Sequence, residues 1–419
     1  MSSQEPVSSP LLSQKSAETV RVTLPAVAGA IGTVSELFYG RMFAAHPELL
    51  RNLFNRGNQA AGTQAQALAG SVAAYATALV TPGRDADAML TRIAHKHASL
   101  GVAPAQYEVV HEHLFGALAE VLADAATDEV VAAWDEVYWR MARTLVESER
   151  ALYARYGVLT GATWRTWEVV ERVRETPEAL TFRIRPADGR PAPRFEAGQY
   201  VSVQAELPDG ARQIRQYSLT GAPDDPVHSF TVKREHPEGG VQGEVSRHLH
   251  DQVREGSALT VSAPYGDLVL DPGTDPHAPL LFASAGIGCT PFQAMLHALV
   301  DRGHQGPVLA LHADRSPGAH ALRAERERLV TKLADARSHL WYEHLPASWD
   351  AEHEAGREGP VVRPGRMELA GIELPEGVRA HLCGPLPFMR GVRAQLLERG
   401  VPAQDIHYEV FGPDLWLAR

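Results

Sequence analysis

The spacing of apolar residues changes twice along the chain, and this change most constrains what the chain can fold into. Over residues 16–157 the apolar positions recur at helical spacing, which predicts an all-α domain. Over residues 163–272 apolar and polar residues alternate, which predicts an antiparallel β-barrel. From residue 278 to 419 short apolar runs alternate with helix-like stretches, as in a parallel α/β sheet of the Rossmann-like kind. The sequence therefore predicts three domains in that order.

The elements of the last third can be placed in more detail. Five apolar runs read as parallel strands, at 280–285, 307–313, 339–345, 378–384 and 406–411. Helices are expected at 319–336 and 387–399. The stretches 156–163 and 271–277 are rich in Gly, Thr or Pro and are predicted to join the domains.

Charge and cysteine content exclude several classes of protein. The formal net charge is −11, which argues against non-specific binding to nucleic acid or to an anionic membrane surface. The two cysteines are too few for a disulfide framework. Residues 278–300 lack charge but contain glycine and proline, so we expect a buried strand, turn and helix rather than a membrane span. No secretory signal is visible, and we expect a cytoplasmic monomer.

Two histidines lie on the predicted helix around residues 90–100. Helical geometry places His97 on the apolar stripe with Ile93 and Ala94. His95 lies on another stripe, which we expect to face water, together with Thr91, Arg92, Ala98 and Ser99. An inward histidine is by itself more often a hydrogen-bonded core residue than a metal ligand.

The surrounding sequence changes that interpretation. Residues 37–43, 46–50, 52–55 and 64–68, followed by His97 and Tyr107, resemble the globin domain of the flavohaemoglobins in both spacing and residue type. The resemblance implies a haem b group with His97 as the iron ligand. It further implies that Phe54 packs on the haem, that Tyr39, Gln64 and Leu68 line the gas-binding side, and that Tyr107 and Glu149 are the partners of His97.

Several alternatives stay open at this point. Gln66 could replace Gln64 if the helix register slips, and Glu149 could be a solvated residue beside Glu147. Tyr39 and Phe54 could be ordinary core aromatics.

The barrel region carries a second set of motifs. Residues 215–218 read Arg-Gln-Tyr-Ser, with Gly-Gln-Tyr at 198–200 upstream and 243–250 downstream, and they resemble the flavin domains of ferredoxin-reductase-like proteins. FAD is the implied cofactor. Arg215 suits a phosphate, Tyr217 the isoalloxazine ring, Ser218 a ring nitrogen, and Ser246 the pyrophosphate at a helix start. The implied set is Tyr200, Arg215, Gln216, Tyr217, Ser218, Gly243 and Ser246, whereas His248 and His250 are expected on a helix face.

A Gly-x-Gly-x-Thr-Pro turn follows the strand at 280–285. Glycines let such a turn approach a phosphate, and proline suits the first turn of a helix, but without the full Gly-x-Gly-x-x-Gly pattern the turn alone is a weak signal. It resembles the version found in ferredoxin-reductase-like proteins, and this resemblance implies NADH or NADPH. The residues concerned are Gly286, Ile287, Gly288, Cys289, Thr290 and Pro291. Arg315 and Arg323 could serve a 2′-phosphate or be surface charges, which leaves the choice of coenzyme open.

The C-terminal motifs complete the resemblance. It implies that Cys383 positions the nicotinamide, that Phe411 covers the flavin until nicotinamide displaces it, and that Glu409 and Lys96 lie where the reductase and globin parts meet. The remaining residues of this motif are Val410, Gly412 and Pro413.

The resemblance extends from about residue 16 to residue 413 and implies a function. Flavohaemoglobins are nitric oxide dioxygenases, which convert nitric oxide and oxygen to nitrate with NAD(P)H and so detoxify nitric oxide. One alternative is an O2- or NO-binding haem sensor or carrier kept reduced by its reductase half. Another is a flavin reductase or oxidase in which the globin is secondary.

Overall fold

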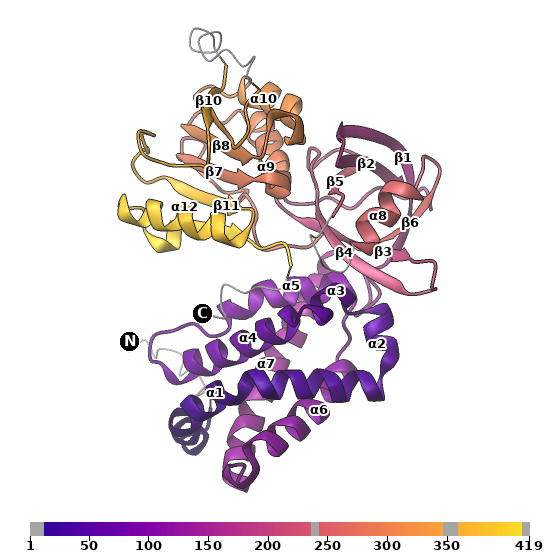
Figure 1. Cartoon of the computed structure of the whole chain (residues 1–419), viewed down its shortest axis with the longest axis vertical. Helices are drawn as coiled ribbons and strands as arrows, with labels where there is room; N and C mark the ends of the chain where they lie inside the picture. Colours follow the sequence, from indigo (N-terminus) through magenta and orange to yellow (C-terminus); the bar gives the residue numbers. More distant parts are fainter. Residues whose placement is uncertain (1–11, 236–242, 347–358, 413–419) are drawn as a thin grey trace, which may run out of the picture. The chain divides into compact units, whose positions relative to one another are not determined.

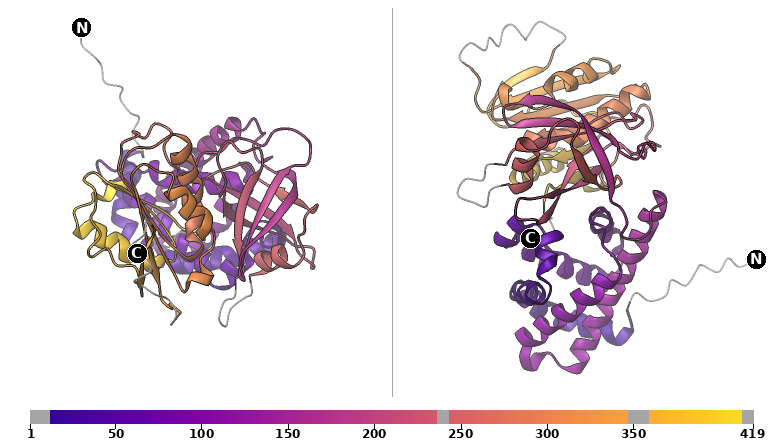
Figure 2. Two further views of the ribbon diagram at one scale, coloured as in Figure 1. Left: turned by 90° about the horizontal axis from the view of Figure 1, so that it is seen from above. Right: turned by 90° about the vertical axis from the view of Figure 1, so that its right-hand side faces the viewer.

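The computed structural model describes residues 12–235, 243–346 and 359–412, and these form two compact units. The first unit contains residues 12–163 and the second residues 164–412 (Figures 1 and 2). The described part of the first unit is helical, and the second contains an antiparallel and a parallel sheet. The predicted fold class and order of the parts are confirmed.

The helices of the first unit have clear start signals. The Ser13 side chain accepts the Ser16 N–H at the start of the first helix, and Thr127 does the same for Val130 at the start of the last. The helices are α1 (Gln14–Ala45), α2 (Pro47–Asn52), α3 (Arg56–Ala60), α4 (Thr63–Val80), η1 (Ala88–Leu90), α5 (Thr91–Leu100), α6 (Ala105–Leu122), η2 (Ala123–Ala125) and α7 (Asp128–Arg155).

Helix α1 is long and apolar enough to cross a membrane by length and composition alone, a test that core helices also pass. One face of α1 packs into the core of the first unit, through Val20, Val27, Ile31 and Val34 among others.

An apolar cavity lies in this core, between α1, α4, α6 and α7. Its volume is about 30 Å³. The polar atoms of its wall bond elsewhere, because Tyr75 donates to Asp87, Trp134 to Thr23 and Tyr138 to the Tyr107 carbonyl. The cavity therefore offers water few partners.

The antiparallel sheet begins the second unit. Its strands are β1 (Arg165–Thr176), β2 (Ala179–Pro186), β3 (Tyr200–Glu206), β4 (Arg212–Ser218), β5 (His228–Lys233) and β6 (Ala258–Val261). They follow the order β4-β3-β6-β1-β2-β5, and a bridge between Leu219 and Phe230 joins the ends of the two outer strands. The sheet thus curls into a barrel, beside which lies α8 (Glu244–Asp251).

The parallel sheet has the order β10-β9-β8-β7-β11-β12. Its strands are β7 (Leu280–Ala285), β8 (Val308–Asp314), β9 (Ala336–Tyr342), β10 (Val361–Pro364), β11 (Arg379–Cys383) and β12 (Ile406–Glu409). Between them lie η3 (Gly286–Cys289), α9 (Thr290–Asp301), η4 (Pro317–Ala319), α10 (Arg323–Val330), α12 (Leu386–Glu398) and η5 (Ala403–Asp405). Strand β7 has β8 as its neighbour on one side and β11 on the other. The chain first adds β8, β9 and β10 on one side of β7 and then β11 and β12 on the other, so the strand order reverses at β7.

One prediction for this part was wrong, and one strand was missed. The helix expected over 319–336 is confined to α10, because Leu322 takes a left-handed φ of 59° just before it and residue 336 already belongs to β9. Strand β10 was not predicted, since its four residues carry too little apolar pattern.

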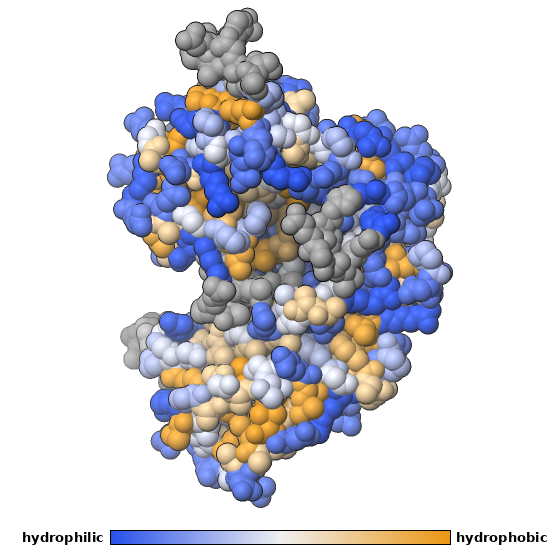
Figure 3. All heavy atoms as spheres, viewed as in Figure 1, coloured by the Kyte–Doolittle hydropathy of each residue, from blue (hydrophilic) through white to orange (hydrophobic). Residues whose placement is uncertain are grey.

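The two sheets of the second unit share one apolar core. Trp167 and Phe230 of the barrel belong to the same buried cluster as Phe282 and Met295 of the parallel sheet and α9. Gly198 shows how closely the parts approach, because a Cβ there would lie 2.2 Å from the Leu268 carbonyl oxygen and 2.5 Å from the Met295 side chain. The visible face of this unit is largely hydrophilic (Figure 3).

Candidate functional site

His97 is held through one ring nitrogen. Its Nδ1 lies 3.0 Å from Glu149 Oε1 and 2.8 Å from the Tyr107 hydroxyl, and that hydroxyl donates a short hydrogen bond to the same carboxylate oxygen. Glu149 is 1% exposed, whereas the His97 side chain is 30% exposed. The structure thus brings together His97, Tyr107 and Glu149, which the sequence analysis had grouped, and leaves Glu147 exposed.

The electrostatics of this group select one form of His97. Burial, reinforced by the charge of Glu149, raises the pKa of Tyr107 far above its usual range, so the phenol remains a neutral donor. Glu149 therefore accepts hydrogen bonds from the Tyr107 hydroxyl and from the Nδ1–H of His97. This arrangement leaves the lone pair on Nε2 for a metal ion.

The surroundings of the second histidine differ from expectation. Thr91 is exposed as expected, but Ala98 and Ser99 are buried and His95 is half-buried like His97, so the prediction was wrong for these three residues. Ser99 tolerates burial because its hydroxyl donates to the Lys96 carbonyl inside the same helix. Contact with Glu149, rather than depth of burial, distinguishes His97.

Aromatic rings gather around Tyr39 on α1. The Phe54 ring packs edge-on against Tyr39 at 5.8 Å and against Phe43 at 5.3 Å. The Gln64 side chain of α4 lies beside Tyr39 and lowers its pKa, but burial outweighs this contact and raises the Tyr39 pKa above its usual range. Tyr39 therefore stays protonated at neutral pH and can act as a donor.

The register of α4 resolves an alternative. Gln64 is half-buried and contacts Tyr39, while Gln66 is exposed. Leu68 packs against the core one turn later on the same helix. Gln64, and not Gln66, is therefore the glutamine that lies beside Tyr39.

Two tyrosines that the sequence analysis missed hold the His97 region in place. The Tyr138 hydroxyl donates to the Tyr107 carbonyl at 2.5 Å, and the Tyr153 hydroxyl donates to the Val102 carbonyl at 3.0 Å. Val102 in turn donates its N–H to the His97 carbonyl. Both tyrosines lie on α7, and Tyr153 follows Glu149 by one helical turn, a spacing that could have pointed to it.

In the barrel, the expected flavin residues lie on β4 and beside it. Arg215 and Tyr217 point to one face of the strand, and Gln216 and Ser218 to the other. The Tyr217 ring stacks on Phe230 with centroids 5.4 Å apart, and Tyr200 of β3 pairs with Ser218. A ring system could lie along the first face, with the Arg215 guanidinium beside it for a phosphate.

The start of α8 is tightly built around Gly243. A Cβ at Gly243 would lie 2.4 Å from Glu235 Cβ and 2.7 Å from the Ser246 hydroxyl. That hydroxyl donates to the Gly243 carbonyl and accepts the Glu235 N–H. Ser246 therefore shapes the helix start with its hydroxyl, and the site expected for a pyrophosphate is the first turn of α8.

The glycine turn after β7 packs directly against the end of β11. Gly286 has a left-handed φ of 54°, and a Cβ at Gly288 would lie 2.4 Å from the Cys383 carbonyl oxygen. Thr290 donates to the Ile287 carbonyl and Pro291 occupies the first turn of α9. The turn lies at the point where the strand order reverses, which is the place where sheets of this kind bind phosphate groups.

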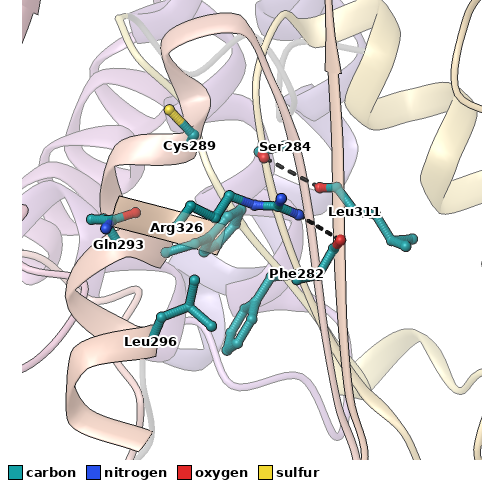
Figure 4. A pocket seen from close by; sticks show the side chains of 9 residues that line it. Phe282, Ser284, Cys289, Gln293, Leu296, Leu311 and Arg326 are labelled. Atoms are coloured by element: carbon teal, nitrogen blue, oxygen red, sulfur yellow. Dashed lines mark hydrogen bonds between the residues drawn. The ribbon is translucent and has the colours of Figure 1, made fainter. Parts of the chain in front are cut away.

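A small cavity lies beneath this turn (Figure 4). Its volume is about 10 Å³, and the residues that line it include Ser284, Cys289, Gln293 and Arg326. Its size suits about one water molecule and excludes a coenzyme. Burial raises the pKa of the Cys289 thiol to about 12, which fits a structural and unreactive cysteine.

The expected C-terminal residues lie at the carboxyl ends of β11 and β12, on the same side of the parallel sheet as the glycine turn after β7. Cys383 is fully buried at the end of β11, in register with Ser284 of β7 and Glu409 of β12. Val410 follows as a half-buried residue, and Phe411 and Gly412 are exposed. Pro413 lies outside the described residues.

Comparisons with known proteins agree with this division of the chain. Residues 36–145 match the Globin family, and residues 282–394 match the family described as Oxidoreductase NAD-binding domain. A helical haem-protein fold is thus joined to a nucleotide-binding oxidoreductase fold in one chain.

Relatives over the full length are more specific. The Flavohemoprotein of Rhizobium meliloti is 39% identical over 97% of this chain and 100% of its own length, and that of Chromobacterium violaceum is 40% identical over 96% and 98%. A flavohemoglobin from Malassezia yamatoensis, solved with bound FAD and heme, is 35% identical, covers 96% of this chain and 100% of that one, and superposes with a TM-score of 0.84. The chain belongs to the flavohemoprotein (flavohaemoglobin) family.

Proposed function

We propose that this chain is a cytoplasmic NAD(P)H-dependent nitric oxide dioxygenase, which converts nitric oxide and oxygen to nitrate and so detoxifies nitric oxide. The FAD/NAD-binding domain of a nitric oxide dioxygenase from Vibrio cholerae supports this proposal, since it is 34% identical, covers 60% of this chain and 100% of that one, and has a TM-score of 0.54. FAD and haem, named for the Malassezia protein, are the cofactors proposed here.

The observation that carries the proposal is the hydrogen bonding of His97 to Glu149 and Tyr107. A carboxylate that accepts the Nδ1 proton increases the electron donation of Nε2 to a bound metal. Strong donation favours chemistry on oxygen over reversible storage. A simple carrier has no need for this buried pair.

The residues present fit both groups. A haem iron takes one nitrogen from the protein, for which His97 Nε2 is available, and the aromatic ring of Phe54 suits the porphyrin face. When bound, FAD would take two electrons from a nicotinamide and pass them singly to the haem. Arg215, Tyr217 and the α8 start would hold FAD, and the turn at Gly286–Cys289 would hold the coenzyme pyrophosphate.

The remaining site residues are assigned on the family resemblance. Cys383 would position the nicotinamide, and Phe411 would cover the flavin. The apolar cavity near α1 and α4 suits uncharged gases better than water.

Turnover on nitric oxide tests the proposal. The purified protein, loaded with haem and FAD, is given NADH, oxygen and nitric oxide, and nitrate is measured beside nitric oxide consumed. We expect many equivalents of nitrate per haem. A sensor or carrier would consume one equivalent at most, and a flavin oxidase would continue to oxidise NADH when cyanide blocks the haem.

Removing the Tyr39 hydroxyl should weaken oxygen retention. Because Tyr39 is a buried, protonated donor, Tyr39→Phe should raise the oxygen dissociation rate of the reduced protein by about tenfold or more. Stopped-flow displacement of oxygen by carbon monoxide measures this rate. Phe43→Leu is the control, since Phe43 stacks on Tyr39 but donates no hydrogen bond. An unchanged rate in Tyr39→Phe would exclude Tyr39 as the donor.

A further inference from the structure

The carboxyl end of β8 is the place where nucleotide-binding sheets of this kind contact the adenosine ribose of a dinucleotide coenzyme. Strands β7 and β8 are parallel neighbours, with Ala285 paired to Ala313, so residues after β8 lie beside the glycine turn after β7. In nucleotide-binding sheets an acidic side chain at such a place bonds the adenosine ribose hydroxyls of NADH, whereas an arginine accommodates the 2′-phosphate of NADPH. This chain has both residue types there, in Asp314 and Arg315.

Asp314 provides a fixed negative charge. Its side chain is 3% exposed, and burial opposes ionisation, yet the His312 ring and the Arg315 N–H stabilise the carboxylate and hold its pKa below the usual value. Lys233 of β5 acts in the same direction. The carboxylate thus persists at neutral pH beside the turn that would hold the pyrophosphate.

The arginines nearby are each matched by other groups. The Arg315 guanidinium donates to Glu178 Oε2 at 2.6 Å, from the turn between β1 and β2 of the barrel. Arg323 donates through Nε to Glu327 Oε1 at 2.7 Å on α10. Arg326 is buried and donates to the Ala310 carbonyl and the Ser338 hydroxyl, so it is directed into the sheet (Figure 4).

A 2′-phosphate would therefore meet a fixed carboxylate and arginines whose charge is already compensated. It would have to displace Glu178 or Glu327 and leave that carboxylate beside its own negative charge. A ribose hydroxyl carries no charge and meets neither cost.

We propose that this chain selects NADH over NADPH, because the charge of the buried Asp314 carboxylate opposes a 2′-phosphate and because Glu178 and Glu327 hold Arg315 and Arg323 away from it. The proposal rests on the function proposed above, since it names the coenzyme of that reductase. The barrel would then contribute to coenzyme specificity, because Glu178 lies in the turn between its strands β1 and β2.

Binding of NAD⁺ and NADP⁺ to the FAD-loaded protein, measured by calorimetry without oxygen or nitric oxide, tests this proposal. We expect NAD⁺ to bind about tenfold more tightly than NADP⁺. In the double variant Glu178→Gln, Glu327→Gln the freed arginines should strengthen NADP⁺ binding by about tenfold and change NAD⁺ binding by less than about twofold.

The matched control is the double variant Glu171→Gln, Glu325→Gln. It removes the same charge from the barrel and from α10, at carboxylates paired with Arg183 and Arg328. Equal binding of both coenzymes by the unmodified protein, or an equal gain of NADP⁺ binding in the control, would overturn the proposal. Because the measurement needs no nitric oxide, its outcome is independent of whether the protein forms nitrate.

Discussion

Replacing His97 with alanine should give a flavoprotein that still reduces artificial acceptors with NADH but has no normal haem spectrum. His97 lies in the first unit, whereas the barrel and the parallel sheet share a core in the second, so the substitution leaves the reductase packing untouched. Loss of a supporting partner of a metal ligand costs about 10- to 100-fold, so loss of the ligand itself should reduce nitric oxide consumption by more than about 100-fold.

Two further variants make this experiment decisive. His95→Ala removes another half-buried histidine of α5 and should keep the spectrum. In His97→Gly, added imidazole should restore haem absorbance, which separates a lost ligand from a misfolded globin unit. A globin spectrum that persists in His97→Ala would refute the assignment of His97 as the ligand.

Features encoded by local pattern were predicted well. The strand at Leu280–Ala285 and the helix from Thr290 follow from an apolar run, a glycine turn and a proline within twelve residues. The period change near residue 163 likewise placed the transition from helices to strands. These signals depend on neighbours in sequence and need no tertiary contact.

Features that depend on distant residues could not be predicted. Arg315 and Glu178 are 137 positions apart, and nothing in the local sequence links the two residues. The burial of Ser99 depends on the packing of a short helix from more than one side, which periodicity along that helix does not report. Tyr107 and Glu149 were placed beside His97 through family resemblance, since helical geometry alone indicated little more than an inward ring.

Substituting Glu149 with glutamine should weaken the reaction without removing the haem. The amide keeps the size of the carboxylate but accepts the His97 Nδ1 proton less strongly, so Nε2 donates less to the iron. We expect nitric oxide consumption to fall about 10- to 100-fold, with the stretching frequency of the iron–histidine bond lowered in resonance Raman spectra of the reduced protein. The absorption spectrum should still report histidine ligation.

Glu147→Gln is the matched control, because Glu147 lies two residues earlier on α7 and is exposed. It should leave both the rate and the stretching frequency unchanged. Tyr107→Phe should move the frequency in the same direction as Glu149→Gln, since the phenol orders the carboxylate through the short bond between them. If Glu149→Gln lowers the rate while the frequency stays fixed, Glu149 acts through the packing of α7 and not through the electron donation of His97.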